Sequence, residues 1–170
     1  TMQVLIIRHA PAEDREVFAL SGQSDDIRPL SEQGKVKMRR NVQGLQKIVP
    51  KLQAIASSPF LRAQQTADLL ARAFSPVPRD TLPALAPLGA VADVLTYLQD
   101  HANTSHIIAL VGHEPDLGQL ATWLLTGHAD NWLPLKKGAA CLLEFPDEVE
   151  AGQAELEWAL TPGQLRGLVE

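Results

Sequence analysis

The chain has 170 residues, of which 45% are hydrophobic and 21% are charged, so it has enough apolar surface to build a compact core. Its formal net charge is -5. Such a charge argues against nonspecific binding to nucleic acid or to an anionic membrane, since both require clustered Lys and Arg. Any site for an anion must therefore be local.

No segment predicts secretion or a membrane span. The apolar residues 3–7 are too few for a secretory signal, and no apolar run approaches about 18 residues. Cys141 is the only cysteine, so an internal disulfide is impossible, and its apolar neighbours predict a buried, inert thiol. We expect a cytosolic protein with one domain over residues 2–170, preceded by Thr1 as an added residue.

The first half of the chain predicts strands that alternate with a loop and helices. In chain order these are a strand at 3–7, a surface loop at 10–29, a helix from the capping residue Ser31 to Pro50, a strand at 52–56 and a helix at about 61–74. The apolar stripe of the first helix is Met38, Val42, Leu45 and Val49. Each strand is thus followed by a helix.

The second half continues this alternation. In chain order we predict a connector at 76–89, a helix at 91–98, a strand at 107–111, a helix from about Asp116, and two strands at 139–145 and 154–160. Alternating strands and amphipathic helices favour an α/β fold, a three-layer sandwich whose mostly parallel central sheet has helices on both faces. Ligands of such sheets gather at the carboxyl ends of the strands.

Polar residues follow three of the predicted strands. Arg8-His9 follows the first strand, and Gly112-His113 follows a later one. Arg62 lies in the first turn of the helix after the second strand, where free backbone N–H groups favour an anion. Because the carboxyl ends of parallel strands meet at one edge of the sheet, we expect these side chains to converge.

The chemistry of these residues predicts a phosphoryl group as the occupant. Two converging guanidiniums repel each other unless an anion lies between them, and Arg binds phosphate oxygens in a bidentate manner. A neutral His9 could attack phosphorus, because the adjacent Arg8 lowers the proton affinity of its imidazole. Arg8, Arg62 and a protonated His113 would then stabilise the charge on the equatorial oxygens.

Each of these residues has a structural alternative when it is taken singly. A His at the end of a strand is more often a surface or hydrogen-bonded residue, and Arg8 or Arg62 could be a solvated charge. The three remaining histidines are scattered, and we expect surface or capping residues at His101, His106 and His128. The sequence lacks the spacings of metal-binding motifs, so we predict no metal and no other cofactor.

Several motifs together resemble one known family. They are Leu5-Ile6-Ile7-Arg8-His9, Arg28-Pro29-Leu30-Ser31 with Gly34, Ser58-Pro59-Phe60-Leu61-Arg62-Ala63 with Gln65-Thr66, and Val111-Gly112-His113. In this order they resemble the histidine phosphatase superfamily, which includes phosphoglycerate mutases, and within it the SixA-type phosphohistidine phosphatases. The resemblance implies a phosphoglycerate mutase-like fold, a covalent phosphohistidine at His9, and a phosphate held by Arg8, Arg62 and His113 without a metal.

The chain departs from the family pattern at two positions. Ala10 stands where the family has Gly, so the backbone there must avoid conformations that only Gly tolerates. In the stretch Pro83-Ala84-Leu85, Ala84 stands where relatives that act on phosphate esters usually present Glu as a proton donor. An alkoxide needs such an acid, whereas the imidazole of a phosphohistidine leaves more readily. The substitution therefore favours a phosphoramidate substrate.

Carboxylates on nearby loops stay open as replacements for the missing acid. The candidate proton donors are Glu114 and Asp14, besides Asp25 and Glu13. Glu114 directly follows His113 and could equally be a carboxylate at the entry of a helix.

The sequence thus predicts a phosphatase that removes the phosphoryl group from phosphohistidine on a signalling or phosphotransfer protein. The alternatives are a phosphatase of small phosphate esters and a non-catalytic binder of phosphoproteins. The expected partner is a phosphorylated protein or a small phosphorylated substrate, and we expect no binding to nucleic acid or to a membrane. We expect the chain to be a monomer.

Overall fold

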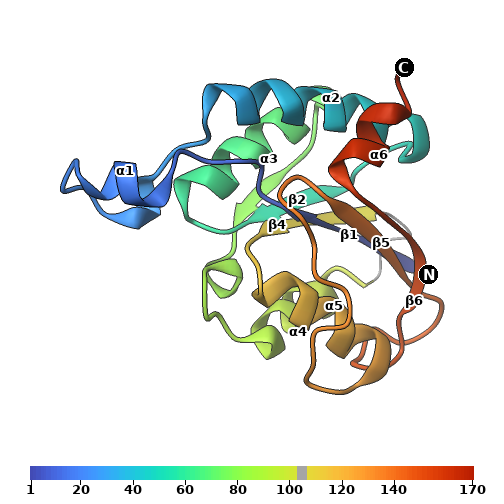
Figure 1. The fold of residues 1–170 in the computed structure, drawn as a ribbon. Coiled ribbons are helices and arrows are strands. Elements are labelled where there is room, and N and C mark those ends of the chain that lie inside the picture. Colours follow the sequence, from blue (N-terminus) through green and yellow to red (C-terminus); the bar gives the residue numbers. More distant parts are fainter. Residues whose placement is uncertain (103–106) are drawn as a thin grey trace.

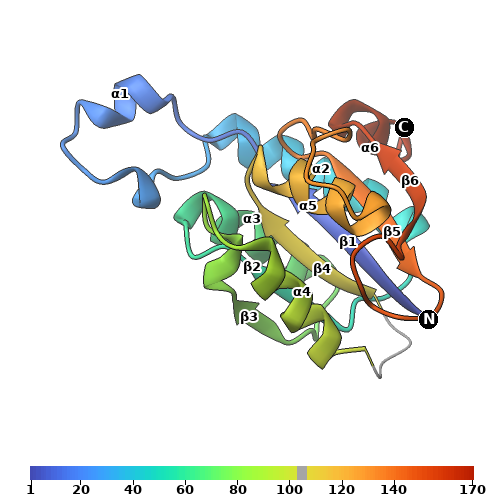
Figure 2. The same cartoon turned by 90° about the horizontal axis from the view of Figure 1, so that it is seen from below.

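The central feature of the protein is a six-stranded sheet with the strand order β3-β2-β4-β1-β5-β6 (Figures 1 and 2). The computed structural model describes residues 1–102 and 107–170. The strands are β1 (Met2–Arg8), β2 (Ala54–Ser57), β3 (Arg79–Thr81), β4 (Ile107–Gly112), β5 (Ala140–Phe145) and β6 (Glu155–Leu160). Strands β3, β2, β4 and β1 are parallel, and β5 runs antiparallel to both β1 and β6. The prediction of a mostly parallel sheet is confirmed.

Helices cover both faces of this sheet, as a comparison of Figures 1 and 2 shows. They are α1 (Arg15–Ala19), α2 (Glu32–Ile48), α3 (Leu61–Ala73), α4 (Val91–Asp100), α5 (Asp116–Thr126) and α6 (Pro162–Gly167), with the short 3-10 helices η1 (Asp25–Ile27) and η2 (Pro83–Leu85). Helices α2, α3 and α6 pack on one face, and α4 and α5 pack on the other. Alternate residues of β1 contribute to the two layers, since successive strand residues point to opposite faces. The predicted three-layer sandwich is confirmed.

Two helix ends show the local chemistry that the sequence indicates. Ser31 caps α2, and its Oγ accepts a hydrogen bond from the backbone N–H of Gly34 at 2.9 Å. Gly127 ends α5 in the left-handed conformation, with φ 78°. Helix α3 begins at Leu61, so Arg62 lies in its first turn as predicted.

Short elements occupy segments that were predicted to be irregular. The predicted loop at 10–29 contains α1 and η1, and it projects from the body as an arm (Figure 1). No residue of α1 is buried, and its five residues are too few to form an apolar stripe that the sequence could reveal. The predicted connector at 76–89 contains the edge strand β3 and η2, and α6 follows the last predicted strand. These elements have between three and six residues, too few to show a period.

Several predictions concern residues away from the strand ends. Cys141 is buried, as predicted, and burial raises the pKa of its thiol to about 12, as expected of an unreactive residue. His101 is the capping residue at the C-terminal end of α4, as predicted, and its Nδ1 lies 2.8 Å from the carbonyl oxygen of Tyr97. His128 is exposed, and His106 lies outside the described residues. In the part of the chain that the structure describes, no helix is both long and apolar enough to cross a membrane.

Candidate active site

The ends of β1 and β4 bring two histidines together. Arg8 pairs with Gly112 in the parallel register of these strands, so His9 and His113 follow at adjacent strand ends. The backbone N–H of His9 donates to the carbonyl of Gly112 at 3.0 Å. The centroids of the two imidazole rings are 5.2 Å apart. The structure therefore places both rings at one edge of the sheet.

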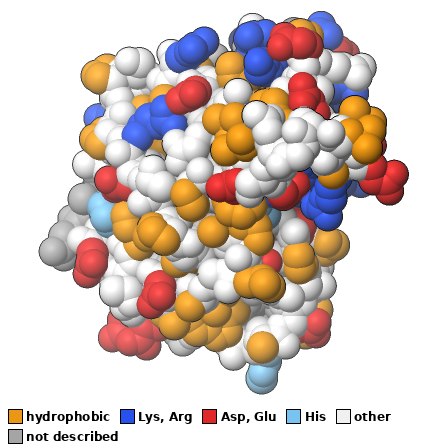
Figure 3. Space-filling view, turned by 90° about the vertical axis from the view of Figure 1, so that its left-hand side faces the viewer, with side chains coloured by type: hydrophobic (Ala, Val, Ile, Leu, Met, Phe, Trp, Pro, Cys, Tyr) orange, Lys and Arg blue, Asp and Glu red, His pale blue; other side chains and the backbone are white. Residues whose placement is uncertain are grey.

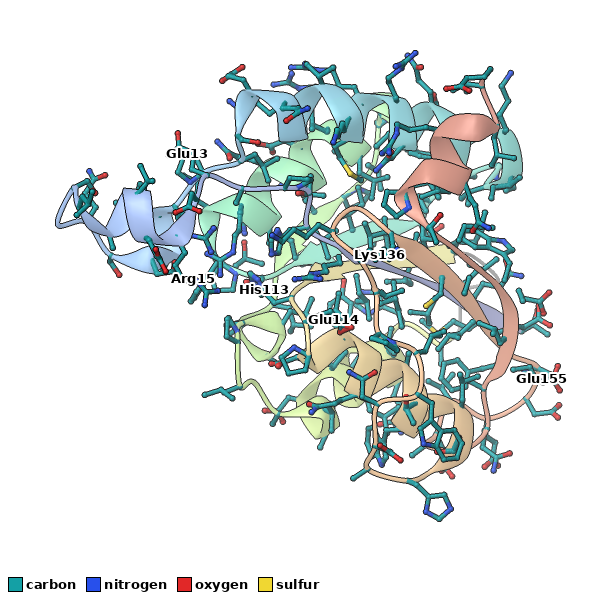
Figure 4. The ribbon with its side chains drawn as sticks, viewed as in Figure 1. Glu13, Arg15, His113, Glu114, Lys136 and Glu155 are labelled. Carbon is teal, nitrogen blue, oxygen red and sulfur yellow. The ribbon has the colours of Figure 1, made fainter. Side chains whose placement is uncertain are left out.

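A cavity of about 400 Å³ opens beside these rings. Its wall is formed by Arg8, His9, Arg15, Phe18, Ala19, Gln23, Asp25, Phe60, Arg62, Pro87, His113 and Glu114. Figure 4 shows Arg15 on the arm and His113 and Glu114 near the end of β4, along the same side of the molecule. All four residues predicted to hold or attack a phosphoryl group thus lie in one wall.

The surroundings of His9 hold its imidazole neutral with a free Nε2. Nδ1 lies 2.7 Å from the carbonyl oxygen of Ala10, and because a carbonyl only accepts, Nδ1 must carry the proton. Burial lowers the pKa of His9 to about 3; the hydrogen bond to Ala10 opposes this shift, and His113, Arg62 and Arg8 add to it. Nε2 therefore carries a lone pair at neutral pH, as a nucleophile requires.

His113 is held by a hydroxyl group and is also neutral. Its Nε2 lies 2.8 Å from Ser58 Oγ, which in turn accepts from the backbone N–H of Phe60 at 3.1 Å. Burial, followed by the charges of Arg62 and Arg8, lowers the pKa of His113 to about 4. A phosphoryl dianion in the cavity would raise this pKa, so the protonated His113 expected in the transition state stays a prediction. If the Ser58 hydroxyl donates to Nε2, the neutral ring donates through Nδ1.

The two predicted arginines are anchored to backbone carbonyl groups. Nη1 of Arg8 donates to the carbonyl of Leu135 at 2.9 Å. Nη1 of Arg62 donates to the carbonyl of Asp25 at 3.0 Å, and its Nη2 lies 3.3 Å from Asp25 Oδ2. Nε of Arg28 donates to the other carboxylate oxygen of Asp25 at 2.9 Å. Asp25 therefore ties the arm to α3 through Arg62, while Arg28 pairs with it from within the arm.

Three residues of the wall keep a buried nitrogen without a partner. Among the residues that the structure describes, the buried side-chain N and O atoms without a hydrogen-bond partner are Arg8 Nε, Arg62 Nε, His113 Nδ1 and Asn131 Oδ1. The first three belong to the cavity wall. An unpaired buried donor costs about 1–3 kcal/mol, so such groups are normally paired. Three of them in one wall suit an anion with several acceptor oxygens.

The backbone next to His9 is fixed by a residue of another motif. Thr66 Oγ1 accepts from the backbone N–H of Ala10 at 3.1 Å and donates to the carbonyl of Arg62 at 2.8 Å. Leu88 is the only non-glycine residue with a positive φ in the described ranges 1–102 and 107–170. Ala10 therefore has an ordinary backbone conformation, and the expectation that it avoids the region reserved for Gly is confirmed.

The two carboxylates of the wall are already engaged. Glu114 accepts backbone hydrogen bonds from Gly118 at 2.5 Å and from Leu135 at 2.7 Å, one on each oxygen. Burial raises the pKa of Asp25, but the hydrogen bond from Arg28 and the neighbouring arginine charges outweigh it, so the pKa is lowered overall. Both groups are thus held as acceptors, which does not favour either as a proton donor.

The remaining candidate donors do not reach the cavity wall. Asp14 caps α1, where its Oδ1 accepts from the backbone N–H of Val17 at 2.9 Å. Glu13 is exposed and binds Arg28 only through its carbonyl. Ala84 lies in η2 and packs against the core layer of α4 and α5. The prediction of Asp14 as a residue of the site is therefore not supported by its position.

Comparison with known proteins adds the family to this geometry. The model of the histidine phosphatase superfamily (branch 1) matches residues 4–92. The chain belongs to this superfamily. The matched residues end before β4, so His113, which follows β4, lies outside the match.

Similar proteins extend over nearly the whole chain. Phosphohistidine phosphatase SixA of Escherichia coli is 31% identical over 97% of both chains. An uncharacterized protein of Picosynechococcus is 36% identical over 80% of this chain and 81% of its own. The structure of the protein histidine phosphatase SixA complexed with tungstate superposes with a TM-score of 0.81 at 29% identity, over 96% of this chain and 99% of that one. These similarities support phosphatase activity.

Sequence reasoning assigned no role to three residues of this phosphatase site, Ser58, Phe60 and Arg15, and it named Asp25 only as a candidate proton donor. Ser58 and Phe60 stand in a motif that was noted for Arg62, and the guanidinium carbon of Arg62 lies 5.1 Å from the centroid of the Phe60 ring. Arg15 and Asp25 lie on the arm, whose sequence shows no period, so no local signal could place them. In the described part of the chain, no three His, Cys, Asp or Glu side chains gather as metal ligands would.

Proposed function

We propose that this histidine phosphatase hydrolyses phosphohistidine on a protein, through a covalent phosphohistidine at His9. The observation that carries the proposal is the set of unpartnered buried nitrogens, Arg8 Nε, Arg62 Nε and His113 Nδ1, in the wall that contains a neutral His9. The oxygens of a phosphoryl group would accept from all three. The similar SixA structure was determined with tungstate, also a tetrahedral oxyanion, which supports an oxyanion site here.

In the first step, Nε2 of His9 forms a bond to phosphorus while the bond between phosphorus and the substrate nitrogen breaks. Arg8, Arg62 and His113 stabilise the charge on the three equatorial oxygens. A substrate imidazole that is protonated on its other nitrogen leaves as neutral imidazole. Such a leaving group needs no acid from the protein.

In the second step, water attacks the phosphorus and the bond to Nε2 of His9 breaks. The Nδ1 proton of His9, held by the carbonyl of Ala10, makes the phosphorylated ring cationic. A cationic ring is the better leaving group, and its departure restores the neutral tautomer with a free Nε2. Phosphate carries away the oxygen of the water, and the proton that the water loses passes to solvent.

The carboxylates of the wall support a phosphoramidate rather than an alkyl phosphate as substrate. Asp25 is paired with Arg28 and Arg62, and Glu114 accepts two backbone hydrogen bonds. An alkoxide leaving group would need a general acid, which contributes about 10²–10⁴-fold to a rate. A phosphohistidine does not depend on that contribution.

Turnover of three substrates under the same conditions tests the proposal: a phosphoramidate, an aryl phosphate and an alkyl phosphate. We expect the first two to react about 10²-fold faster than the third. Labelled phosphate should be trapped on the wild-type protein but not on His9→Ala. Alkyl phosphate turnover equal to that of phosphoramidate would favour a phosphatase of small esters. Absence of trapped phosphate with every substrate would favour a non-catalytic binder.

A further inference from the structure

The two most exposed large hydrophobic side chains of the described residues both lie beside the cavity. Leu88 is 94% exposed and Leu20 is 87% exposed. Leu88 follows Pro87, and Leu20 follows Ala19, and both of these preceding residues belong to the cavity wall. Single exposed apolar residues are common on protein surfaces, but their concentration at the mouth of a site marks an interaction surface.

The backbone holds Leu88 outward in an unfavourable conformation. Its φ is 66°, in a tight turn closed by the hydrogen bond from the N–H of Gly89 to the carbonyl of Ala86 at 2.9 Å. Four-residue turns with Pro at the second position and a positive φ at the third normally have Gly or Asn at the third position. Asp116 holds this turn, since its Oδ2 accepts from the N–H of Leu88 at 2.6 Å. Strain of this kind at the mouth of a site points to a functional side chain.

The opposite side of the mouth is formed by the arm. Phe18 and Ala19 of α1 reach the cavity wall, whereas Val17 is 66% exposed and no residue of this helix is buried. Figure 3 looks onto this face, where hydrophobic side chains are interspersed with both acidic side chains and Lys and Arg side chains. Besides Asp25, which pairs with Arg28 and Arg62, the exposed acidic residues of the arm are Glu13, Asp14, Glu16 and Asp26, and Arg15 is its exposed basic residue. The outer surface of the arm is therefore apolar and mainly acidic.

We propose that Leu88 on one side and Val17 and Leu20 on the other form a docking surface for the protein that carries the phosphohistidine. The partner presents its phosphohistidine on an apolar surface that is flanked by Lys or Arg, which complements the acidic arm. A small phosphate ester inside the cavity does not reach these side chains, because they lie outside its wall. A second copy of this chain is disfavoured as the occupant, because two acidic arms would face each other across a twofold interface.

This inference rests on the proposed function, and three phosphohistidine peptides of equal length test it. Leu and Lys flank the phosphohistidine in the first, Leu and Glu in the second, and Ser and Gly in the third. We expect wild-type kcat/KM to be about tenfold higher for the first peptide than for the third, the difference that burial of one leucine provides. The second peptide should react more slowly than the first, and the difference should shrink as salt rises.

The double variant Leu20→Ser/Leu88→Asn should lose most of the wild-type preference for the first peptide over the third and should keep the salt-dependent difference between the first and second peptides, while its turnover of phosphoramidate stays close to that of wild type. Asn tolerates the positive φ, so the melting temperature should not fall. Val36→Ser is the matched control, because Val36 is 54% exposed on α2 and lies outside the cavity wall. It should keep the peptide preference of wild type.

Binding to His9→Ala separates this inference from the proposed function. If wild type hydrolyses no peptide, but His9→Ala binds the first peptide more tightly than the third through Leu20 and Leu88, the docking surface stands and the proposed reaction fails. If hydrolysis occurs without preference among the peptides, or if the double variant keeps the wild-type preference, the docking surface is refuted.

Discussion

Replacing Gly34 by Ala is expected to displace the nucleophile through the backbone. Gly34 lies in the first turn of α2, and a Cβ there would lie 1.9 Å from the carbonyl oxygen of Pro11. In real structures a Cβ essentially never lies within 3.0 Å of a nonbonded heavy atom from another segment, so close packing requires the two segments to separate by about 1 Å. Pro11 directly follows Ala10, whose carbonyl holds Nδ1 of His9.

The size of the effect follows from this displacement. The same Pro11 oxygen accepts from the backbone N–H of Ser31 at 3.1 Å, and the separation weakens that bond. Overpacking lowers the free energy of unfolding by about 1–3 kcal/mol, and the higher helix propensity of Ala than of Gly offsets at most about 1 kcal/mol of this loss. We therefore expect the free energy of unfolding to fall by about 1–2 kcal/mol. A shift of about 1 Å at His9 should lower kcat about 10²-fold.

Urea denaturation and phosphoramidate turnover measure the two effects of Gly34→Ala. The control is Gly167→Ala in α6, where an added Cβ has no heavy atom within 4 Å. The control should unfold at the same or a higher urea concentration than wild type and should keep wild-type turnover. The reasoning is refuted if Gly34→Ala unfolds like wild type and turns over phosphoramidate at the wild-type rate.

Three further predictions concern the histidines and Glu114. Ser58→Ala removes the hydrogen bond to His113 Nε2 and should lower kcat/KM for phosphoramidate about tenfold, whereas an unchanged value would show that the hydroxyl does not orient the ring. Glu114→Gln should lower the free energy of unfolding by about 1 kcal/mol and change kcat less than threefold, and a loss of about 10²-fold in kcat would instead identify a proton donor. The pKa of His9, about 3, and that of His113, about 4, lie below the ordinary value of 6.5, so the unfolded state binds more protons below pH 6.5. Urea titrations should therefore show a free energy of unfolding that is largest above about pH 6.5 and falls as the pH approaches 3, and a flatter profile for His9→Gln/His113→Gln.

The positions of the site residues along the chain could be predicted because strand and helix periods are local properties. The runs that became β1 and β4 end at Arg8 and Gly112, and parallel strands bring their carboxyl ends to one edge. This rule places His9 and His113 together before any contact is known. Arg62 follows from the same logic, since the turn after β2 leads into the first turn of α3.

The short elements could not be predicted because they carry no period. Strand β3 has three exposed residues, and α1 has five residues and no buried face. Such elements are stabilised by their neighbours rather than by their own apolar pattern. Arg15 and Asp25 therefore reach the cavity only because η1 of the arm contacts α3, where Asp25 pairs with Arg62.

Protonation and hydrogen bonding at the site were decided by the tertiary structure alone. The sequence suggests a charged His113 and an acidic Glu114, since both residue types can take these forms. Burial beside two guanidiniums lowers the pKa of His113 to about 4, and two backbone N–H groups engage the Glu114 carboxylate. Residue order determines which groups meet at the sheet edge, whereas burial and partners distant in the chain determine the pKa of His113 and the hydrogen bonds of Glu114.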